Sequence, residues 1–460
     1  MGMKTIFITS FDGVETKNVL RSSIFSTILE DKNTRVVVFV KNEKRAQAHK
    51  AEFGDSDRIF YEVVGNISIA GLDRLFQWLK FTMLKTTTTD LRRFIRYKVE
   101  GGLFQYWLGL FTNRLLSNRW CLALSRRLDY LLVANHTYDK FFEKYKPDLV
   151  FLANIFYEPE VHFLRAAKKH RVKTIGFINS WDKITARCVL RLMPDKFVVF
   201  NDLVRDELKY YDLASDEDIF VGGIPQYDIY FDGQSTARDE FCRQIGLDPN
   251  KKFIVYAPHG SSYSNSDWDM IDLLYSLNQK GSFGENIEIF VRFHPYDLVS
   301  EEEVKKRPNL KFDLSGTHFA SKVANYQRGD DWEMDTSQLA RLRDTLYHMS
   351  LLVCYASSLS IDAAIFDRPV INVNFETRPD SHFRYFREYF KIAHYKKALD
   401  AGGIRLVGSP DELAIAAKNY LLNPGLDRDG RKRLIEEQCK FTDGESGRRI
   451  GQFVLDNLSQ

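Results

Sequence analysis

The sequence predicts an α/β protein with two domains, each a parallel sheet covered by helices. Short apolar runs rich in Val, Ile and Phe alternate with helical patterns in both halves of the chain, which indicates repeated strand–helix–strand units. The 460 residues exceed what one ordinary core accommodates, so two domains of about 200 residues each are expected. A hydrophobic content of 44% and a charged content of 28% are typical of a globular protein.

The first domain is predicted over residues 1–231. Strands are expected at the apolar runs over residues 5–8, 36–40, 149–152, 174–178 and 197–200. The turn Phe11-Asp12-Gly13 follows the first strand and precedes an amphipathic helix that runs through Val19 and Ile28. Strand, helix and strand at this spacing favour a parallel sheet.

The second domain is predicted over residues 232–440. It follows a linker-like run of Asp, Gly, Gln, Ser and Thr at 232–236. Its strands are expected over residues 253–256, 287–293, 351–355 and 370–373. Residues 441–460 are predicted to form a helix that returns to the first domain.

A helical insertion over about 71–133 interrupts the first domain. It interleaves basic residues with the aromatic residues Phe76, Trp78, Phe81, Phe94, Phe104, Trp107 and Phe111. This pattern is typical of a surface that meets an anionic membrane or a lipid-linked phosphate. A helical hairpin with its aromatic rings in the core and its cations in water fits the same sequence, so both interpretations stay open here.

Composition excludes several classes of protein. The net charge of +3 gives no whole-protein argument for nucleic acid as a partner. No apolar stretch reaches the roughly 20 residues of a membrane span, and the N-terminus lacks a signal-peptide core, so a cytoplasmic protein is expected. The five cysteines are odd in number and widely spaced, so neither a disulfide framework nor a structural zinc is expected.

Common nucleotide and hydrolase motifs are missing from the sequence. It contains no G-x-G-x-x-G, no G-x-x-x-x-G-K-[ST] and no G-x-S-x-G. Nicotinamide enzymes, P-loop phosphotransferases and nucleophile-elbow hydrolases are therefore disfavoured.

Polar residues follow two predicted strands of the second domain. His294 stands before Pro295 at the end of one strand, and Arg292 precedes it by two residues on the same side. Ser357 and Ser358 follow the next strand and open a helical pattern. Because ligands bind outside the carboxyl ends of parallel strands, these residues predict a phosphate site, although a structural histidine and an ordinary N-cap are the alternative.

Two loops add candidate residues. His259 and Ser261 follow the first strand of the second domain, where small residues approach a pyrophosphate closely, although a plain Gly-Ser loop would look the same. Asp182 follows a strand of the first domain, where a carboxylate is placed to take a proton from an incoming hydroxyl. A helix N-cap or an ion-pair partner of Lys183 or Arg187 is the alternative for Asp182.

The order of these motifs resembles one family group, from about residue 147 to 450. It is similar to the two-domain glycosyltransferase-B fold, and within it to the CDP-glycerol glycerophosphotransferases that polymerise teichoic acids; bacterial polysialyltransferases share the His-Pro and Ser-Ser pair. The matching motifs are Trp181-Asp182, where that family has Trp-His-Gly, then 223–228, 256–261, His294-Pro295, Ser357-Ser358 with Asp362, and 443–450. The resemblance implies two Rossmann-like domains with a cleft between them.

The resemblance also implies roles for individual residues. Arg292, His294, His259, Ser261, Ser357, Ser358 and Asp362 would bind the donor, and Arg21 and Trp181 the acceptor. Asp182 stands where the family has a catalytic histidine, so it is expected to be the general base, with Asp12 second and His294 assisting. A carboxylate base favours sugar transfer over glycerol phosphate transfer.

The sequence thus predicts a metal-independent glycosyltransferase without a cofactor. Its partners would be a nucleotide-activated sugar, a glycan or lipid-linked acceptor of the cell envelope and the inner face of an anionic membrane, without nucleic acid. A glycerophosphotransferase or nucleotide-sugar 2-epimerase on the same fold, and a non-catalytic nucleotide-sugar binding protein, are the alternatives.

Overall fold

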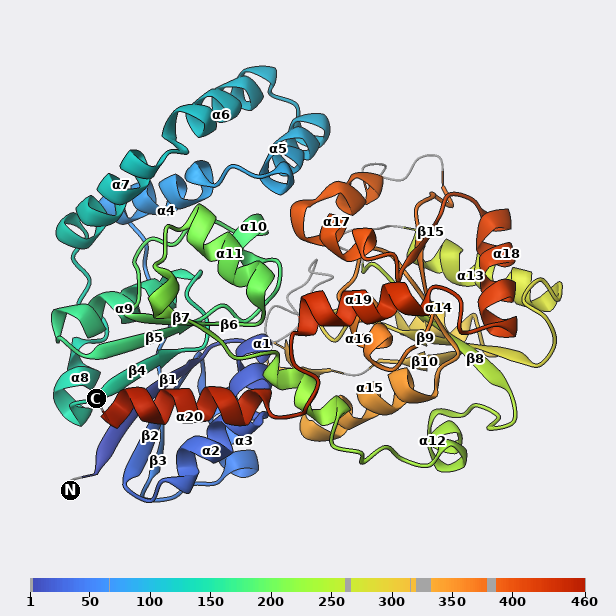
Figure 1. The fold of residues 1–460 in the computed structure, drawn as a ribbon, viewed down its shortest axis with the longest axis horizontal. Coiled ribbons are helices and arrows are strands. Elements are labelled where there is room, and N and C mark those ends of the chain that lie inside the picture. Colours follow the sequence, from blue (N-terminus) through green and yellow to red (C-terminus); the bar gives the residue numbers. More distant parts are fainter. Residues whose placement is uncertain are drawn as a thin grey trace. The chain divides into compact units, whose positions relative to one another are not determined.

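The computed structural model describes residues 3–65, 67–260, 266–314, 316–319, 332–378 and 386–459. The chain divides into two compact units. Unit 1 comprises Met1–Phe231 and Cys439–Gln460, and unit 2 comprises Asp232–Gln438. Each unit contains one parallel sheet (Figure 1).

The sheet of unit 1 has seven parallel strands in the order β3-β2-β1-β4-β5-β6-β7. They are β1 (Lys4–Ser10), β2 (Thr34–Val40), β3 (Ile59–Val63), β4 (Leu149–Leu152), β5 (Lys173–Phe177), β6 (Lys196–Val199) and β7 (Ile219–Val221). Strand order reverses where β1 meets β4. In an open parallel sheet this switch point, at the carboxyl ends of the strands, is where ligands bind.

Helices lie on both faces of this sheet (Figure 1). The helices of unit 1 are α1 (Gly13–Glu15), α2 (Ser23–Glu30), α3 (Glu43–Phe53), α4 (Gly71–Met83), α5 (Thr87–Glu100), α6 (Leu103–Leu116), α7 (Arg119–Leu132), α8 (Asp139–Tyr145), α9 (Glu158–Lys169), α10 (Lys183–Ala186), α11 (Asp202–Tyr211) and α20 (Ser446–Ser459), with the π-helix η1 (Thr16–Leu20) and the 3₁₀ helices η2 (Asp216–Asp218) and η3 (Pro225–Tyr230). Of these, α4 to α7 form a separate group away from the sheet (Figure 1). Between the sheet and α8 and α9, aromatic rings fill the core. Phe39 packs edge-on against Phe7 at 4.8 Å and against Phe163 at 4.7 Å.

The segment after β1 differs from the single amphipathic helix that its periodicity predicts. Asp12 caps the short helix α1 through a capping box with Glu15, and the chain then forms the π-helix η1 before α2 begins. Glu15, Thr16 and Asn18 are buried there although they are polar. Such π-turns are rare and occur frequently at functional sites.

The sheet of unit 2 has six parallel strands in the order β10-β9-β8-β13-β14-β15. They are β8 (Lys252–Ala257), β9 (Ile287–Arg292), β10 (Lys311–Asp313), β13 (Leu351–Cys354), β14 (Val370–Val373) and β15 (Arg405–Val407). The strands β11 (Thr317–His318) and β12 (Trp332–Glu333) form a separate antiparallel pair. Here the switch point lies between β8 and β13.

Helices α12 to α19 belong to the second series of elements. They are α12 (Arg238–Ile245), α13 (Asp267–Gln279), α14 (Glu301–Lys305), α15 (Thr336–His348), α16 (Leu359–Ile365), α17 (Ala393–Asp400), α18 (Pro410–Leu422) and α19 (Arg428–Cys439), with the 3₁₀ helix η4 (Phe386–Lys391).

The C-terminal helix α20 packs on α2 of unit 1. Asp228 holds its first turn, because the Asp228 carboxylate accepts hydrogen bonds from the Ser446 amide at 3.0 Å and the Gly447 amide at 2.7 Å. A Cβ at Gly447 would lie 2.8 Å from the Ser23 hydroxyl, so the helices approach closely at that glycine. The motifs around Asp228 and Gly447 therefore have a structural purpose in this chain.

Candidate active site

His294 lies just beyond the carboxyl end of β9, and its side chain is exposed. The Tyr296 amide donates to its Nδ1 at 3.2 Å, and the rings of Tyr296 and Trp332 pack against it at 4.0 and 5.2 Å. Since Nδ1 accepts this bond, the neutral ring carries its proton on Nε2. Nε2 is then the atom that can donate to a phosphate oxygen.

Ser357 and Ser358 follow β13, the strand on the other side of β8. The Leu359 amide donates to the Ser357 hydroxyl at 3.3 Å, whereas Ser358 makes no side-chain cap of α16. A buried hydrogen-bond network supports this loop. The Tyr395 hydroxyl lies 2.7 Å from Asn372 Oδ1 and 3.0 Å from the Ser360 hydroxyl, and it also donates to the Ser357 carbonyl. The predicted donor residue Asp362 is buried within α16.

The loop after β8 is held from below by Asp267. The Asp267 carboxylate accepts hydrogen bonds from the His259 amide at 3.1 Å and the Gly260 amide at 2.9 Å. The His259 ring stacks on Tyr355 at 5.1 Å, and burial lowers the pKa of His259 to about 4. His259 is therefore neutral at pH 7 and offers hydrogen bonds rather than charge. Ser261, also predicted to bind the donor, lies outside the described residues.

Two predicted phosphate ligands have other partners. Arg292 is buried and forms an ion pair with Asp313 of the neighbouring strand β10. Arg21, predicted to bind an acceptor phosphate, donates through Nε and Nη2 to Glu52 at 2.8 and 2.6 Å, and its side chain is 4% exposed. Each guanidinium thus has a carboxylate partner inside its own unit, and the binding roles of Arg292 and Arg21 stay predictions.

In unit 1, Asp182 lies half-buried at the start of α10, next to the half-buried Trp181. The Asp182 carboxylate makes no side-chain cap of the helix, and it accepts a hydrogen bond from the Ser180 hydroxyl. The structure therefore does not support the alternative that the Asp182 side chain caps the helix. Lys183, the next residue, is buried and donates to Asn179 Oδ1 at 2.5 Å.

Asp12 lies on the turn after β1, half-buried, and its carboxylate accepts a hydrogen bond from the Glu15 amide at 3.0 Å. Asp12 and Asp182 act on one common neighbour: burial lowers the pKa of Lys183, and the charges of both carboxylates oppose that effect. The two predicted bases thus lie near enough to Lys183 for their charges to act on it. Both are therefore candidates to meet an acceptor hydroxyl.

Sequence reasoning missed two buried acids beside Asp12. Glu15 and Glu160 are fully buried in unit 1. The D-x-x-E spacing of Asp12 and Glu15 is a capping-box signal that could have drawn attention to Glu15. The sequence around Glu160 contains no motif that marks it, because Glu15, which lies beside it in the fold, is distant in the sequence.

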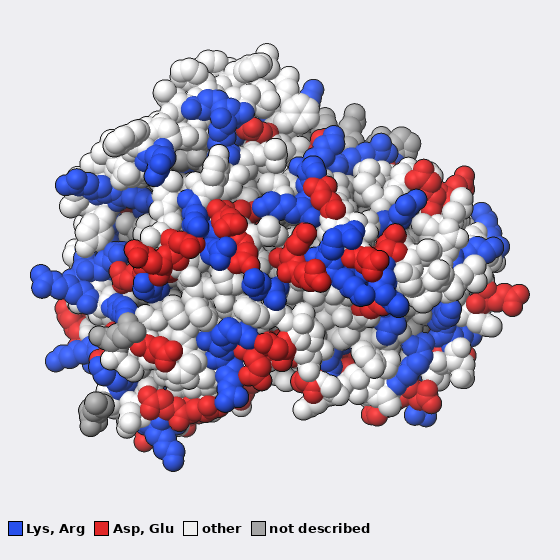
Figure 2. Space-filling model, viewed as in Figure 1, with Lys and Arg blue, Asp and Glu red and all other residues white. Residues whose placement is uncertain are grey.

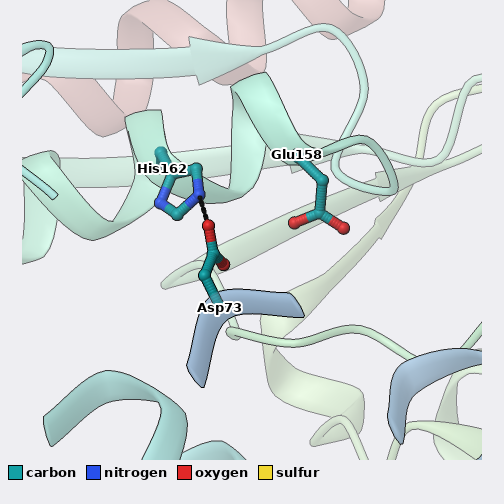
Figure 3. A group of neighbouring side chains, drawn as sticks. All are labelled: Asp73, Glu158 and His162. Atoms are coloured by element: carbon teal, nitrogen blue, oxygen red, sulfur yellow. Dashed lines mark hydrogen bonds and ion pairs between the residues drawn. The ribbon is translucent and has the colours of Figure 1, made fainter. Parts of the chain in front are cut away.

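One group of side chains in unit 1 resembles a metal site. Asp73 of α4 and Glu158 and His162 of α9 place ligand atoms within 4.8 Å of one another (Figure 3). Buried cations already pair with these carboxylates: Arg191 lies 2.7 Å from Asp73, and Lys80 lies 2.7 Å from Glu158. Burial opposes ionisation of Asp73, but bonds from His162 and Arg191 outweigh it and lower the pKa of Asp73.

These ion pairs extend to α7, where Asp129 accepts from Arg165 at 2.5 Å and from Arg191 at 2.7 Å. Three carboxylates therefore face three cations, and a divalent ion would add unbalanced charge. We interpret this group as a structural ion cluster that ties the insertion to α9.

The predicted insertion consists of α4 to α7, and its aromatic residues are largely exposed. On α6 an apolar stripe faces outward, formed by Leu103, Phe104, Trp107, Leu108, Phe111 and Leu115. Trp78 and Phe81 of α4 and Trp120 of α7 are also exposed, and among the predicted aromatic residues Phe76 is buried. A hairpin with all its aromatic rings in the core is therefore wrong.

None of the helices in the described residues is long and apolar enough to cross a membrane.

Three comparisons place the chain among known proteins. A family model described as CDP-glycerol:poly(glycerophosphate) glycerophosphotransferase matches residues 192–456. The teichoic acid ribitol-phosphate polymerase TarL of Staphylococcus aureus is 23% identical over 241 residues, which cover 51% of this chain and 36% of TarL. The chain thus matches about a third of that relative's length.

Solved structures share the fold over the whole chain. A UDP-N-acetylglucosamine 2-epimerase superposes with a TM-score of 0.52 at 13% identity, covering 99% of this chain and 95% of the other. The S. aureus MnaA–UDP structure gives 0.52 at 11% identity, covering 100% and 98%. The wall teichoic acid polymerase TagF gives 0.50 at 16% identity, covering 100% and 90%. The predicted glycosyltransferase-B architecture is confirmed.

Proposed function

The chain belongs to the CDP-glycerol:poly(glycerophosphate) glycerophosphotransferase family, and from that premise we propose that it moves a sugar from a nucleotide-activated donor to a hydroxyl of an envelope glycan or lipid-linked acceptor. One observation carries the proposal: the exposed imidazole of His294 and the hydroxyls of Ser357 and Ser358 follow the strands beside β8, where the sheet order reverses. This is where a parallel sheet binds a nucleotide.

Unit 2 would bind the donor. His294 Nε2 would donate to the diphosphate, while the neutral ring of His259 and the hydroxyls of Ser357 and Ser358 would supply uncharged donors. With Arg292 paired inside the unit, charge on a departing diphosphate would be stabilised by oriented hydrogen bonds more than by a guanidinium.

Unit 1 would supply the acceptor side, with Asp182 as the general base. The acceptor hydroxyl loses its proton to the Asp182 carboxylate, its oxygen bonds to the sugar carbon, and the bond from that carbon to the diphosphate oxygen breaks. The nucleotide diphosphate leaves with the bonding electron pair. Each step uses the chain's own residues, so we propose that transfer requires neither a metal nor a cofactor.

The experiment is a melting screen over nucleotides, followed by product analysis with a panel of nucleotide-activated donors. A nucleotide that binds the native state raises the apparent melting temperature by mass action. Sugar added to an acceptor supports the proposal, and a free epimerised sugar nucleotide would instead identify an epimerase. Binding without turnover on any acceptor would leave a nucleotide-sugar binding protein.

A second candidate is transfer of a polyol phosphate. The family match and the likeness to TarL over half of this chain favour it. In that reaction the hydroxyl oxygen attacks phosphorus, and a nucleoside monophosphate leaves. The same panel separates the two, because a CDP-activated polyol adds a polyol phosphate to the acceptor and releases CMP, whereas a sugar activated by a nucleoside diphosphate adds the sugar alone and releases the nucleoside diphosphate.

We also propose that α4 to α7 dock on the inner, anionic face of a membrane. Beside the apolar stripe of α6, this region exposes basic side chains, namely Arg74, Lys85, Arg92, Arg96, Lys98, Arg114, Arg119 and Arg127, whereas Glu100, which pairs with Arg96, is the one exposed acid within 71–133. Figure 2 shows the surface over α5 to α7 as mainly uncharged, with scattered basic groups. Amphipathic helices bind an anionic bilayer by burying apolar side chains among the lipids and by attraction between basic side chains and the anionic headgroups.

Vesicle binding tests this docking. We expect vesicles with anionic lipid to retain the protein at low salt and to release it as ionic strength rises, because charge attraction is screened. The pair W107S/F111S on α6 should weaken retention, as should R119E/R127E on α7. Tyr210→Ser, at an exposed ring outside the insertion, is the control.

Equal retention on neutral and anionic vesicles would argue against the charge contribution. Arg92 and Arg93 are unsuitable for reversal, since Arg92 donates to the Ala186 carbonyl and Arg93 pairs with Asp90.

A further inference from the structure

Two buried carboxyl groups lie side by side at the switch point of unit 1. Glu15 follows β1, and Glu160 is in the first turn of α9, which follows β4; β1 and β4 are neighbouring strands. Both side chains are 0% exposed. A buried acid is rare unless it is paired with a cation, and two adjacent buried acids are rarer still.

The pair has few donors. The Glu15 carboxylate accepts hydrogen bonds from three uncharged groups, namely the Phe11 amide at 2.5 Å, Asn154 Nδ2 at 3.1 Å and the Asp12 amide at 3.4 Å. Within the described residues, the carboxyl group of Glu160 has no donor from another residue's amide, hydroxyl or cation, and its own backbone amide is the donor beside it. The carboxyl groups of Glu15 and Glu160 lie close enough to hydrogen-bond each other. Since carboxylate oxygens only accept, this bond requires a proton on one of the two groups.

Among the charged and titratable groups around the pair, burial and repulsion between carboxylates outweigh the attraction of one cation. Asp12 from the β1 turn adds a third carboxylate, and the hydroxyls of Tyr138 and Tyr157 are uncharged. Lys183 of α10 attracts Glu15, but its amino group is bonded to Asn179, and Arg187 repels Lys183. Burial and then the charge of Asp12 raise the pKa of Glu15 to about 7. Burial and then Glu15 raise the pKa of Glu160 well above its usual value.

We propose that Glu15 and Glu160 share a proton and that this protonated pair is a positioning element for Asp12 in the acceptor site. The Glu15 carboxylate accepts from the Phe11 and Asp12 amides, and the Glu15 amide donates to the Asp12 carboxylate. If the pair loses its last proton, two adjacent buried anions repel each other. Glu15 then moves away from the turn, and Asp12 loses its orientation.

This inference rests on the proposed transferase function, and its tests separate the two. The first test is infrared spectroscopy of the intact protein, which needs no turnover. Wild type minus E160Q should show the C=O stretch of a protonated carboxyl group at neutral pH. Asp267→Asn is the control, because burial raises the pKa of Asp267, in unit 2, to about 7. The band lost in Asp267→Asn should differ from the band lost in E160Q. No such band in the E160Q difference overturns the proposal, whatever the enzyme does.

The second test is the pH profile of kcat. In wild type we expect an alkaline limb that falls about tenfold per pH unit once the pair loses its last proton. In E160Q the amide stays a neutral donor to Glu15 at every pH, so this limb should disappear. E160A removes the donor and should be slow throughout, and restoration by Gln distinguishes positioning from a merely structural role. An unchanged limb in E160Q overturns the proposal, and a protonated pair in an inactive protein overturns only the proposed function.

Discussion

At the residue scale, His294 has its Nδ1 occupied by a backbone amide and its ring at the surface. If Nε2 donates to the donor diphosphate, His294→Ala should weaken binding of a nucleoside diphosphate by the roughly 1.5 to 3 kcal/mol of a charge-assisted hydrogen bond. Isothermal calorimetry measures this loss. His136→Ala, at an exposed histidine of unit 1, is the control, and unchanged affinity in folded His294→Ala would end the phosphate role.

Asp182 makes the second prediction. Its side chain does not cap α10, and Asn retains an oxygen that can accept from the Ser180 hydroxyl, so Asp182→Asn should fold normally. Removing a general base should slow transfer roughly 100- to 10,000-fold while donor affinity stays near wild type. Single-turnover kinetics with calorimetry of donor binding measures both. Native turnover in this variant would pass the role of base to Asp12.

Glu160 predicts a pH dependence of stability. Because the folded-state pKa values of Glu15 and Glu160 are raised, the native state holds protons that the unfolded chain releases. The contribution of Glu15 to stability is full below the ordinary glutamate pKa of about 4.3 and is lost as pH rises through its folded-state pKa of about 7, and the contribution of Glu160 is lost as pH rises through its own raised pKa. E160Q should therefore gain stability relative to wild type between pH 5 and pH 8.

Urea unfolding at the two pH values measures that gain. Glu143→Gln, at an exposed glutamate, should show none. An equal difference at both pH values would mean that the pair is ionised in the folded protein.

At the element scale, α4, α7 and α9 are joined by buried charge. Arg191 lies 2.7 Å from both Asp73 and Asp129 and also pairs with Glu158, so Arg191→Met would leave the three buried carboxylates facing only two buried cations, Lys80 and Arg165. Breaking such pairs costs about 3 to 5 kcal/mol, and we expect Arg191→Met to lower the free energy of unfolding by that amount. Denaturant unfolding checks this.

A chelator provides the matching test of the same cluster. If the cations of Arg191 and Lys80 already satisfy the carboxylates, EDTA should leave the melting temperature of the native protein unchanged. A fall in melting temperature that zinc restores would show a metal where we infer ion pairs.

The strands that the sequence predicted are those buried on both faces. β4 and β14 were predicted to the residue, because a continuous apolar run ends sharply at a polar or turn residue. β7, β10 and β15 were missed, since each is three residues long and partly exposed, and β3 was missed although it has five. Each of these four is an edge strand of its sheet. Because an edge strand is partly exposed to solvent, its sequence lacks the continuous apolar run by which the central strands are recognised.

At the scale of the whole molecule, the architecture could be predicted, whereas the neutralisation of individual charges could not. Strand–helix alternation gives two parallel sheets, and parallel sheets gather loops at one end, so the region of His294 and Ser357 follows from topology. Arg292 pairs with Asp313 and Arg21 with Glu52, and neither pairing leaves a local sequence signal. Contacts between residues distant in the chain decide which cations remain available to a ligand.

The return of α20 to unit 1 has a consequence for how the chain is made. Unit 2, Asp232–Gln438, is synthesised between the seventh strand of unit 1 and the helix that covers α2. At ribosomal speeds of about 5 to 20 residues per second, that interval lasts roughly 10 to 40 s. During this interval α20 does not yet cover the face of α2 around Ser23 and Thr27, so this face of nascent unit 1 is accessible to chaperones and to other chains. It is covered only after α20 has been synthesised and its first turn binds Asp228.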